Sequence, residues 1–378
     1  MRKFYLQSKI YFGEDSLNTL AEITAENAVI FTDAFMKNAG NVDKIAKLMT
    51  GCDRISVYSE IIPDPPIELI VSGLKFLLAA DAQVAVALGG GSVIDAAKSI
   101  LFMYERKAGK RIPLVAIPTT SGTGSEVTKF AVITDTEEDA KYPLVSDRLL
   151  PDIAILSAEL TMSVPASITA DTGFDVITHA LEAYISTGAN DFTDAFAEKA
   201  LELCFEYLPK ACKNGNDREA REKMHTASCL AGMAFNDAGL GVNHGIAHAL
   251  GAVFHIPHGR ANAIILPHVM AYNAELESGL FGKDASVACV KMAKLARAFG
   301  MPAYSPKQGA ANLVGELGRM TKALGIPQTL SEAGVSMKDY EASKAHIVAH
   351  AVNDACTATN PRKIDASAVQ RILKGIEK

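Results

Sequence analysis

Histidines gather in one short stretch of this chain. Between residues 239 and 259 the sequence reads GLGVNHGIAHALGAVFHIPHG, which contains His244, His248, His255 and His258. A histidine in apolar surroundings costs free energy unless it has a partner. Four of the nine histidines fall within this stretch, which favours a shared metal site over separate core histidines. The spacing alone leaves open which of the four is not a ligand.

A second motif supplies a carboxylate. Residues 172–184 read TGFDVITHALEAY, a helical pattern that contains Asp175 and His179. Their i, i+4 spacing puts both side chains on one face of a helix, one turn apart. One carboxylate with three imidazoles suits a divalent first-row ion such as Fe, Zn, Co, Ni or Mn. The set contains no cysteine, which disfavours a structural zinc site.

Two turns rich in glycine and hydroxyl groups predict a phosphate cradle. Residues 84–98 read VAVALGGGSVIDAAK, a strand, three glycines and a helix expected to begin at Ser92. Residues 117–127 read IPTTSGTGSEV and follow another apolar strand. Glycine lets backbone approach a phosphate, the helix start supplies free N–H groups, and Ser92 either caps the helix or donates to a phosphate oxygen. The spacing differs from G-x-G-x-x-G, and a turn without a ligand is the alternative for each motif alone.

Asp33 ends an apolar run, VIFTD. A carboxylate after a strand in this fold class accepts from an adenosine ribose hydroxyl and repels a 2′-phosphate, which favours NAD over NADP. A capping aspartate is the equal alternative.

The elements that position these motifs change along the chain. Apolar runs at 28–31, 55–57, 84–88, 114–117 and 153–156 alternate with helical patterns at 41–48, 67–78 and 92–102. This alternation predicts a parallel sheet covered on both faces. After Ser163 the strand-like runs disappear and segments such as 193–208 and 218–235 have helical spacing. We therefore expect an α/β dinucleotide-binding domain over 1–162 and an all-helical metal-binding domain over 163–378.

Composition excludes several classes of protein. The net charge of −6 argues against a nucleic-acid partner and an anionic membrane surface. No run approaches the ~20 apolar residues of a membrane span, and the N-terminus lacks the apolar core of a secretory signal. The six cysteines are scattered without a C-x-x-C pair, as expected of free thiols in a reducing cytoplasm.

Taken together, these motifs resemble the iron-containing (group III) alcohol dehydrogenases. The likeness runs nearly end to end: G-G-G-S-x-x-D-x-A-K (89–98), P-T-T-S-G-T-G-S-E-V-T (118–128), G-F-D-x-x-T-H-A-L-E-A-Y, N-H-G-x-A-H-x-L-G with P-H-G, and C-T-x-x-N-P-R (356–362). The resemblance implies a dehydroquinate synthase-like fold, an NAD cofactor and Fe(II), with zinc or another divalent ion as the alternative. An aspartate at 64 (IIPDPP) replaces the family's usual asparagine, which puts one cofactor contact in doubt.

The resemblance also assigns roles by position. It implies metal ligation by Asp175, His179, His244 and His258, and a proton relay at His248. It gives His255 no role and places Cys356 near the substrate pocket. The implied cofactor contacts are Asp33, Gly90, Gly91, Ser92, Thr119, Thr120, Thr123 and Lys141.

Within the family, stretches such as RISVYSEIIPDP and KYPLVSD look most similar to the propanol dehydrogenases of bacterial microcompartments. This implies interconversion of propanal and 1-propanol by a homodimer or larger oligomer, in the cytoplasm or inside such a compartment with other enzymes. Butanol, 1,3-propanediol and lactaldehyde dehydrogenases share the core motifs and remain alternatives. Further alternatives are a glycerol dehydrogenase, a related lyase, a metal hydrolase and a non-enzymatic component of a microcompartment.

Overall fold

The computed structural model describes residues 4–136, 140–279 and 285–377, apart from the side chains of Ala140 and Lys141. These residues form two compact units. The first runs up to Val164 and includes Gly215–Asn236, and the second consists of Pro165–Asn214 and the chain from Asp237 onward. Within these described ranges, no helix has the length and apolar character that crossing a membrane requires.

A parallel sheet organises the first unit. Its six strands lie in the order β1 (Lys9–Phe12), β8 (Ile153–Leu156), β5 (Leu114–Pro118), β4 (Val84–Gly89), β2 (Ala25–Asp33) and β3 (Cys52–Ile61), with every neighbouring pair parallel. All five apolar runs expected to be strands lie in this sheet. A separate antiparallel hairpin joins β6 (Phe130–Asp135) to β7 (Ala140–Val145).

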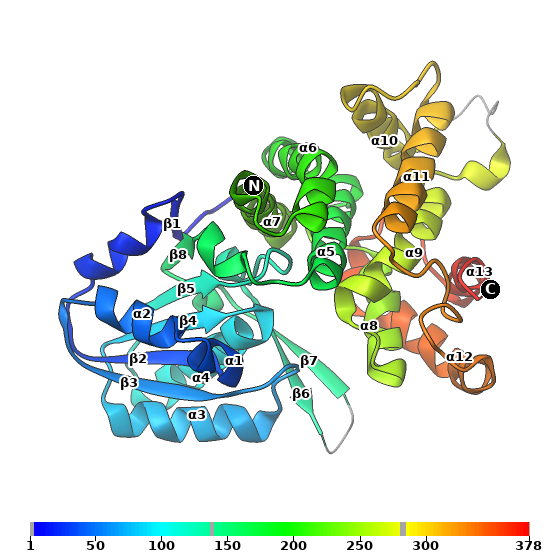
Figure 1. Cartoon of the computed structure of the whole chain (residues 1–378). Helices are drawn as coiled ribbons and strands as arrows, with labels where there is room; N and C mark the ends of the chain where they lie inside the picture. Colours follow the sequence, from blue (N-terminus) through cyan, green and yellow to red (C-terminus); the bar gives the residue numbers. More distant parts are fainter. Residues whose placement is uncertain (1–3, 137–139, 280–284, 378) are drawn as a thin grey trace. The chain divides into compact units, whose positions relative to one another are not determined.

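Helices cover both faces of the sheet (Figure 1). α3 (Ile67–Ala80) and α4 (Gly91–Ala108) pack on one face, and α2 (Asn41–Leu48) with the 3₁₀ turn Ser16–Glu22 packs on the other. Val29 and Phe31 of β2 pack into the core beneath α3 and α4, whereas Ala28 and Ile30 pack into the core beneath α2 and the 3₁₀ turn. Successive strand residues point to opposite faces, so a strand buried on both sides is apolar throughout. The short helix α1 (Ala34–Asn38) directly follows β2.

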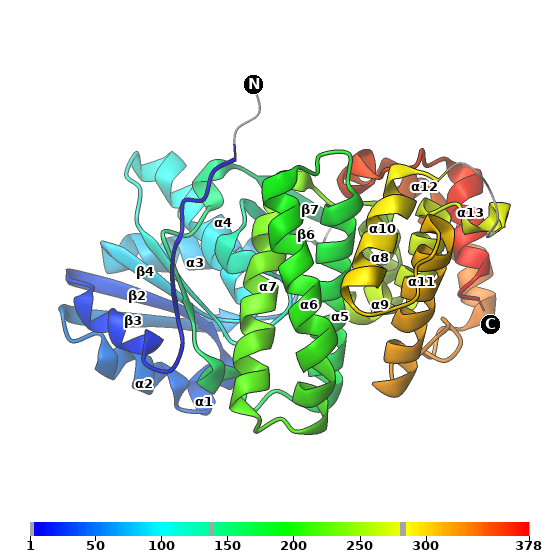
Figure 2. The same ribbon diagram turned by 90° about the horizontal axis from the view of Figure 1, so that it is seen from above.

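The described residues of the second unit form helices joined by loops, with no strand among them. This unit contains α5 (Ala166–Ile185), α6 (Asp191–Lys213), α8 (Val242–Phe254), α9 (His258–Asn273), α10 (Val287–Ala298), α11 (Pro306–Ala323), α12 (Met337–Asn353) and α13 (Ala366–Lys374). Figure 2 shows α5 and α6 lying side by side, as do α10 and α11. Side-chain caps define several starts: Asn190 forms a capping box at α6, and Ser336 accepts from the third backbone N–H of α12.

The expected fold class is confirmed: an α/β unit with a parallel sheet precedes a helical unit. The expected division after residue 162 stays a prediction about domains. The compact units differ from that division in two places. The first unit ends at Val164, and Gly215–Asn236, most of α7 (Arg218–Ala238), belongs with the sheet.

Candidate functional site

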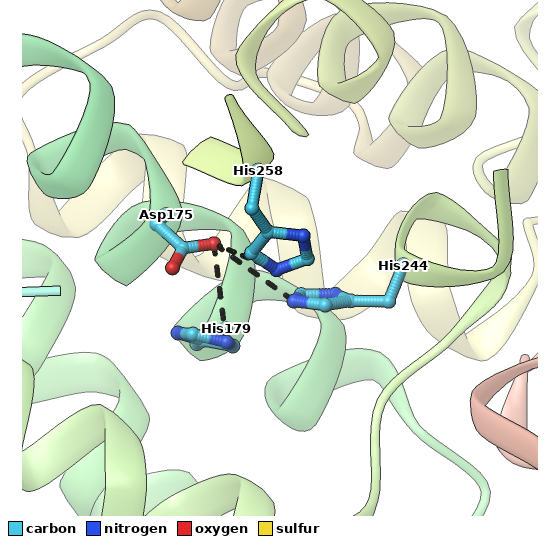
Figure 3. Close-up of side chains that lie close together, drawn as sticks. All are labelled: Asp175, His179, His244 and His258. Atoms are coloured by element: carbon cyan, nitrogen blue, oxygen red, sulfur yellow. Dashed lines mark ion pairs between the residues drawn. The ribbon is translucent and has the colours of Figure 1, made fainter. Parts of the chain in front are cut away.

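Four side chains from three helices converge in the helical unit (Figure 3). Asp175 and His179 lie one turn apart on α5, His244 lies on α8, and His258 begins α9. One ligand atom of each lies within 4.8 Å of the other three. Asp175 Oδ1 is 3.9 Å from the Nε2 of His179, 4.0 Å from that of His244 and 3.5 Å from that of His258. The structure thus brings together the four residues that the resemblance picks out.

A buried carboxylate orients one of these imidazoles. Glu182 Oε2 lies 2.6 Å from His244 Nδ1, and Oε1 accepts the backbone N–H of Asn243 at 2.8 Å. An ionised Glu182 accepts the Nδ1 hydrogen and so directs the Nε2 lone pair of His244 at the cluster. Burial raises the pKa of Glu182 to about 8, and hydrogen bonds from the backbone N–H groups of residues 241, 243 and 244 oppose this rise. A cation bound at the cluster would oppose it further, so metal binding favours the ionised form that orients His244. Burial, with the neighbouring imidazoles, lowers the pKa of His244 well below its usual range, so this imidazole is neutral, the form that binds metals.

An amide lies where the ligand atoms converge. Asn262 Nδ2 is 2.7 Å from Asp175 Oδ1, 3.1 Å from His258 Nε2 and 3.3 Å from His244 Nε2. An amide NH₂ only donates, so these three ligand atoms direct lone pairs at one partially positive group. Asn243 Nδ2 donates to Asn262 Oδ1 at 2.9 Å and fixes this orientation. Convergent acceptors, one of them a carboxylate, fit a divalent cation held by one oxygen and three nitrogens.

His248 and Cys356 lie in a second cluster of the same unit. His248 Nδ1 is 2.9 Å from Asp354 Oδ2, and the Cys356 backbone N–H donates to Asp354 Oδ1 at 2.8 Å. The His248 ring stacks on that of His258 with centroids 5.3 Å apart. The relay candidate is thus adjacent to the metal cluster without belonging to it. His255 ends α8 in the left-handed conformation at φ 54° and is not one of the four clustered ligands.

The two cradle turns of the first unit pack against each other at the carboxyl ends of β4 and β5. The Thr119 backbone N–H donates to the Gly89 carbonyl at 3.1 Å. A Cβ on Gly91 would lie 2.5 Å from Thr123 Cγ2, and one on Gly90 would lie 3.3 Å from Thr120 Oγ1. A side chain at position 91 would require Thr123 to move, and one at position 90 would be tightly packed, so glycine suits this close approach. The adjacent helix start offers backbone N–H groups to a phosphate. The residues therefore fit a dinucleotide pyrophosphate.

A buried lysine fixes the second turn. Lys98 Nζ donates to Ser125 Oγ and the Thr128 carbonyl, both at 2.8 Å, and to the Phe130 carbonyl at 2.9 Å. Asp95 Oδ1 accepts from Ser125 Oγ at 2.6 Å. Burial lowers the pKa of Lys98 to about 8, opposed by the charge of Asp95. Lys98 and Asp95 of α4 thus fix the position of the hydroxyl-rich turn, and their polar atoms are used within the protein instead of for a ligand.

A buried histidine of α7 holds the same turn. His225 Nε2 lies 3.1 Å from the Pro118 carbonyl, and Nδ1 lies 2.9 Å from Ser121 Oγ. Because a carbonyl only accepts, Nε2 carries the hydrogen and Nδ1 accepts from the serine. Burial lowers the pKa of His225 to about 4, so the ring is neutral.

The remaining predicted cofactor residues have mixed outcomes. Asp33 caps α1 by accepting the Met36 N–H at 2.8 Å, which confirms the capping alternative and leaves one carboxylate oxygen for a ribose. The helix expected to begin at Ser92 begins one residue earlier, at Gly91, with Gly90 as its cap and no side-chain cap bond. Of the two roles offered for Ser92, capping is therefore excluded and donation to a phosphate stays a prediction. The side chain of Lys141 lies outside the described residues.

Sequence reasoning missed the residues that support the ligands. Glu182 lies within the motif at 172–184, Asn262 follows the stretch 239–259 by three positions, and Asp354 precedes the first residue of the terminal C-T motif by two positions. Glu182 follows His179 by three residues, so it shares the ligand face of α5, which is the one signal that could have identified it. Asn262 follows His258 by four residues and could have been found by the same rule.

Comparisons with known proteins agree with this geometry. The model of the iron-containing alcohol dehydrogenases matches residues 7–158, and that of the C-terminal part of the Fe-containing alcohol dehydrogenase family matches residues 169–376. A 1-propanol dehydrogenase of Salmonella typhimurium is 43% identical, with 99% of each chain covered. An NADPH-dependent butanol dehydrogenase of Clostridium saccharobutylicum is 35% identical over 99% of this chain and 97% of its own.

A solved structure extends the likeness to the fold. Sulfoacetaldehyde reductase from Bifidobacterium kashiwanohense, in complex with NAD⁺, matches with a TM-score of 0.86 and 26% identity over 100% of this chain and 98% of its own. The family models, the full-length relatives and this fold lead to one conclusion: the chain belongs to the iron-containing alcohol dehydrogenase family.

Proposed function

We propose that this protein is an NAD-dependent alcohol dehydrogenase that interconverts propanal and 1-propanol, with Fe(II) held by Asp175, His179, His244 and His258. The convergence of these four ligands within 4.8 Å carries the proposal. The 43% identity to a 1-propanol dehydrogenase over 99% of both chains supports the substrate. Zinc or another divalent ion is the alternative occupant, because the donor set suits several first-row ions.

The first unit binds the cofactor in this proposal. The backbone at Gly90 and Gly91, with the hydroxyls of Ser92, Thr119, Thr120 and Thr123, holds the pyrophosphate, and Lys141 adds a further contact. The free oxygen of Asp33 accepts from the adenosine ribose and disfavours a 2′-phosphate. NAD supplies the hydride acceptor and NADH the donor when bound.

The second unit binds and protonates the substrate. A divalent ion at the four ligands supplies a Lewis acid toward the alcohol or aldehyde oxygen. Asp354 accepts the Nδ1 hydrogen of His248, which leaves Nε2 to exchange a proton with substrate or solvent. Cys356, which is partly exposed and hydrogen-bonded to Asp354 through its backbone N–H, lies near the substrate in this proposal. His248 and Asp354 thus move the proton that accompanies hydride transfer.

Butanal, 3-hydroxypropanal and lactaldehyde remain the alternative substrates, because dehydrogenases for related alcohols share the family. We further propose a homodimer or larger oligomer in the cytoplasm or within a microcompartment. A non-enzymatic component of such a compartment would not require the buried Glu182 that orients His244.

The test is NADH oxidation with propanal by metal-stripped protein, before and after anaerobic addition of Fe(II). We expect activity only after iron is added, higher kcat/KM with NADH than with NADPH, and higher kcat/KM for propanal than for butanal, 3-hydroxypropanal or lactaldehyde. If zinc restored activity and Fe(II) did not, the metal at the four ligands would be zinc instead of iron. Absence of activity with both ions would refute the dehydrogenase assignment.

A further inference from the structure

Three ligand-type side chains outside the four-residue centre lie together at the end of α12. His248 comes from α8, Asp354 caps the 3₁₀ turn Ala355–Thr359, and Cys356 lies within that turn. One ligand atom from each lies within 4.8 Å of the other two, and all three residues are partly exposed. Each of the three residues therefore keeps part of its surface open to solvent.

The carboxylate at the centre of this cluster is preorganised. Asp354 accepts from His248 Nδ1 at 2.9 Å, from the Cys356 backbone N–H at 2.8 Å and from the Cys356 thiol. The imidazole and the thiol each direct a hydrogen at one anionic group, and a cation would replace those hydrogens.

We propose that His248, Asp354 and Cys356 form a second divalent-cation site, which takes zinc in preference to Fe(II). Its donors are one sulfur, one nitrogen and one oxygen, whereas the first centre offers no sulfur, and thiolate ligands select zinc. Tetrahedral zinc with bonds of about 2.0–2.3 Å holds its ligand atoms roughly 3.3–3.8 Å apart. Small side-chain rotations therefore close this cluster around an ion.

Charge and protons balance in this site. Zinc binds the Cys356 thiolate, and the thiol proton leaves to solvent. His248 binds through Nδ1 and its hydrogen moves to Nε2 through solvent, so one proton is released in all. The thiolate and the Asp354 carboxylate neutralise the zinc charge, which limits repulsion from an ion at the adjacent centre.

Zinc at this site would inhibit the enzyme because the metal would occupy Nδ1 of His248 and the ring's one hydrogen would lie on Nε2, so the ring could no longer accept a proton. This consequence rests on the proposed function, whereas zinc binding itself does not. The two are separated by measuring metal content and thiol protection independently of activity.

The experiment uses full-length protein loaded anaerobically with one equivalent of Fe(II) and then titrated with Zn(II). Iron and zinc per chain are measured after gel filtration, and alkylation of each cysteine is followed by mass spectrometry. We expect one zinc to bind with the iron retained, and alkylation of Cys356 to slow by about 10-fold or more because the bound thiolate is not available. Co(II) in place of zinc should give a thiolate-to-cobalt charge-transfer band.

Two variants and one control decide the assignment. Cys356→Ser and Asp354→Asn should lose the second zinc while retaining the first iron, whose presence reports a folded helical unit. Cys52→Ser, which alters a partly buried cysteine of the other unit, should bind zinc as the wild type does. Exchange of iron for zinc without a second equivalent, an unprotected Cys356, or undiminished zinc binding by Cys356→Ser would each overturn the proposal.

Discussion

The two glycine-rich turns of the first unit and the four-residue cluster of the second unit offer different chemical groups to their expected ligands. In the first unit, backbone groups at Gly90 and Gly91 face the expected ligand, and charged residues such as Lys98 serve to hold the turn. In the second unit, charged and ionisable side chains face the expected ligand, and Asn262 and Glu182 orient them. The cradle depends on steric fit, whereas the metal centre depends on charge and on the direction of lone pairs.

This difference implies that the two regions fail in different ways. A ligand deletion in the metal centre removes a bond to the ion but leaves the helices packed. Removing a side chain that supports the glycine-rich turns leaves the backbone groups proposed to bind the nucleotide unchanged but makes their position less fixed. The following changes test that contrast, from the largest expected effect to the smallest.

The largest effect is expected at a metal ligand. His258→Ala should lower kcat by about 1,000-fold or more, because it removes one of four ligands from the centre that supplies electrostatic stabilisation. Iron content after gel filtration should fall sharply while NADH binding, measured by fluorescence, stays unchanged. His255→Asn is the matched control, since asparagine tolerates the left-handed backbone at that position and His255 is not in the cluster. Full iron retention by His258→Ala would remove this residue from the ligand set.

The next largest effect is expected at Lys98, which fixes the hydroxyl-rich turn of the first unit. Lys98→Met should destabilise the first unit by about 3–5 kcal/mol, because it leaves Asp95 buried without its cation. NADH binding should weaken with it, and iron content should stay at one per chain. Urea unfolding and NADH titration measure the two effects. Lys199→Met is the control, because its exposed pair with Glu202 contributes ~0–1 kcal/mol.

Acid should destabilise the cradle through His225. Its pKa is lowered from 6.5 in the unfolded chain to about 4 by burial, so the unfolded chain binds more protons between these values. Stability therefore falls as pH drops from about 6.5 toward 4, and the loss attributable to this group between pH 7 and pH 5 is about 2 kcal/mol. His225→Gln should show a correspondingly smaller loss in urea unfolding of metal-free protein at the two pH values. An identical pH dependence in wild type and variant would contradict the depressed pKa.

How much the sequence reveals differs between the two regions for a physical reason. Ligands must be particular residue types at particular helical spacings, so Asp175 and His179 stand out on one helix face. The residues that orient these ligands do not stand out in the sequence. Glu182 and His244 are 62 positions apart, and they come into contact only when α5 packs against α8. A glutamate in a helix otherwise looks like part of a solvated face.

The first unit shows the same limit for long-range packing. The apolar runs predicted the sheet because a strand buried on both faces must be apolar throughout. Nothing local in α7 indicates that His225 meets Pro118 and Ser121, more than 100 positions earlier, so the segment reads as part of the helical region. The start of α4 was misplaced for a smaller reason: a glycine cap has no side chain to signal it.

The smallest effect tests whether the cradle works by steric fit. Gly91→Ala places a Cβ 2.5 Å from Thr123 Cγ2, so the two turns must separate by several tenths of an ångström. We expect the NADH Kd to rise by about 10-fold, or ~1.4 kcal/mol, with iron content unchanged. Gly318→Ala is the control, since no heavy atom lies within 4 Å of its added Cβ.

A second substitution identifies the cause of that loss. Thr123→Ser removes Cγ2, the nearest atom, and gives the remaining hydroxyl, which would lie 2.9 Å from the added Cβ, room to rotate away. The pair Gly91→Ala with Thr123→Ser should therefore recover most of the lost affinity if the clash is responsible. Recovery would show that the glycine is required for space between two turns of the protein. Affinity that stays low in the pair would instead show that the Cβ obstructs the cofactor itself, because the relief of the internal clash would then change nothing at the nucleotide.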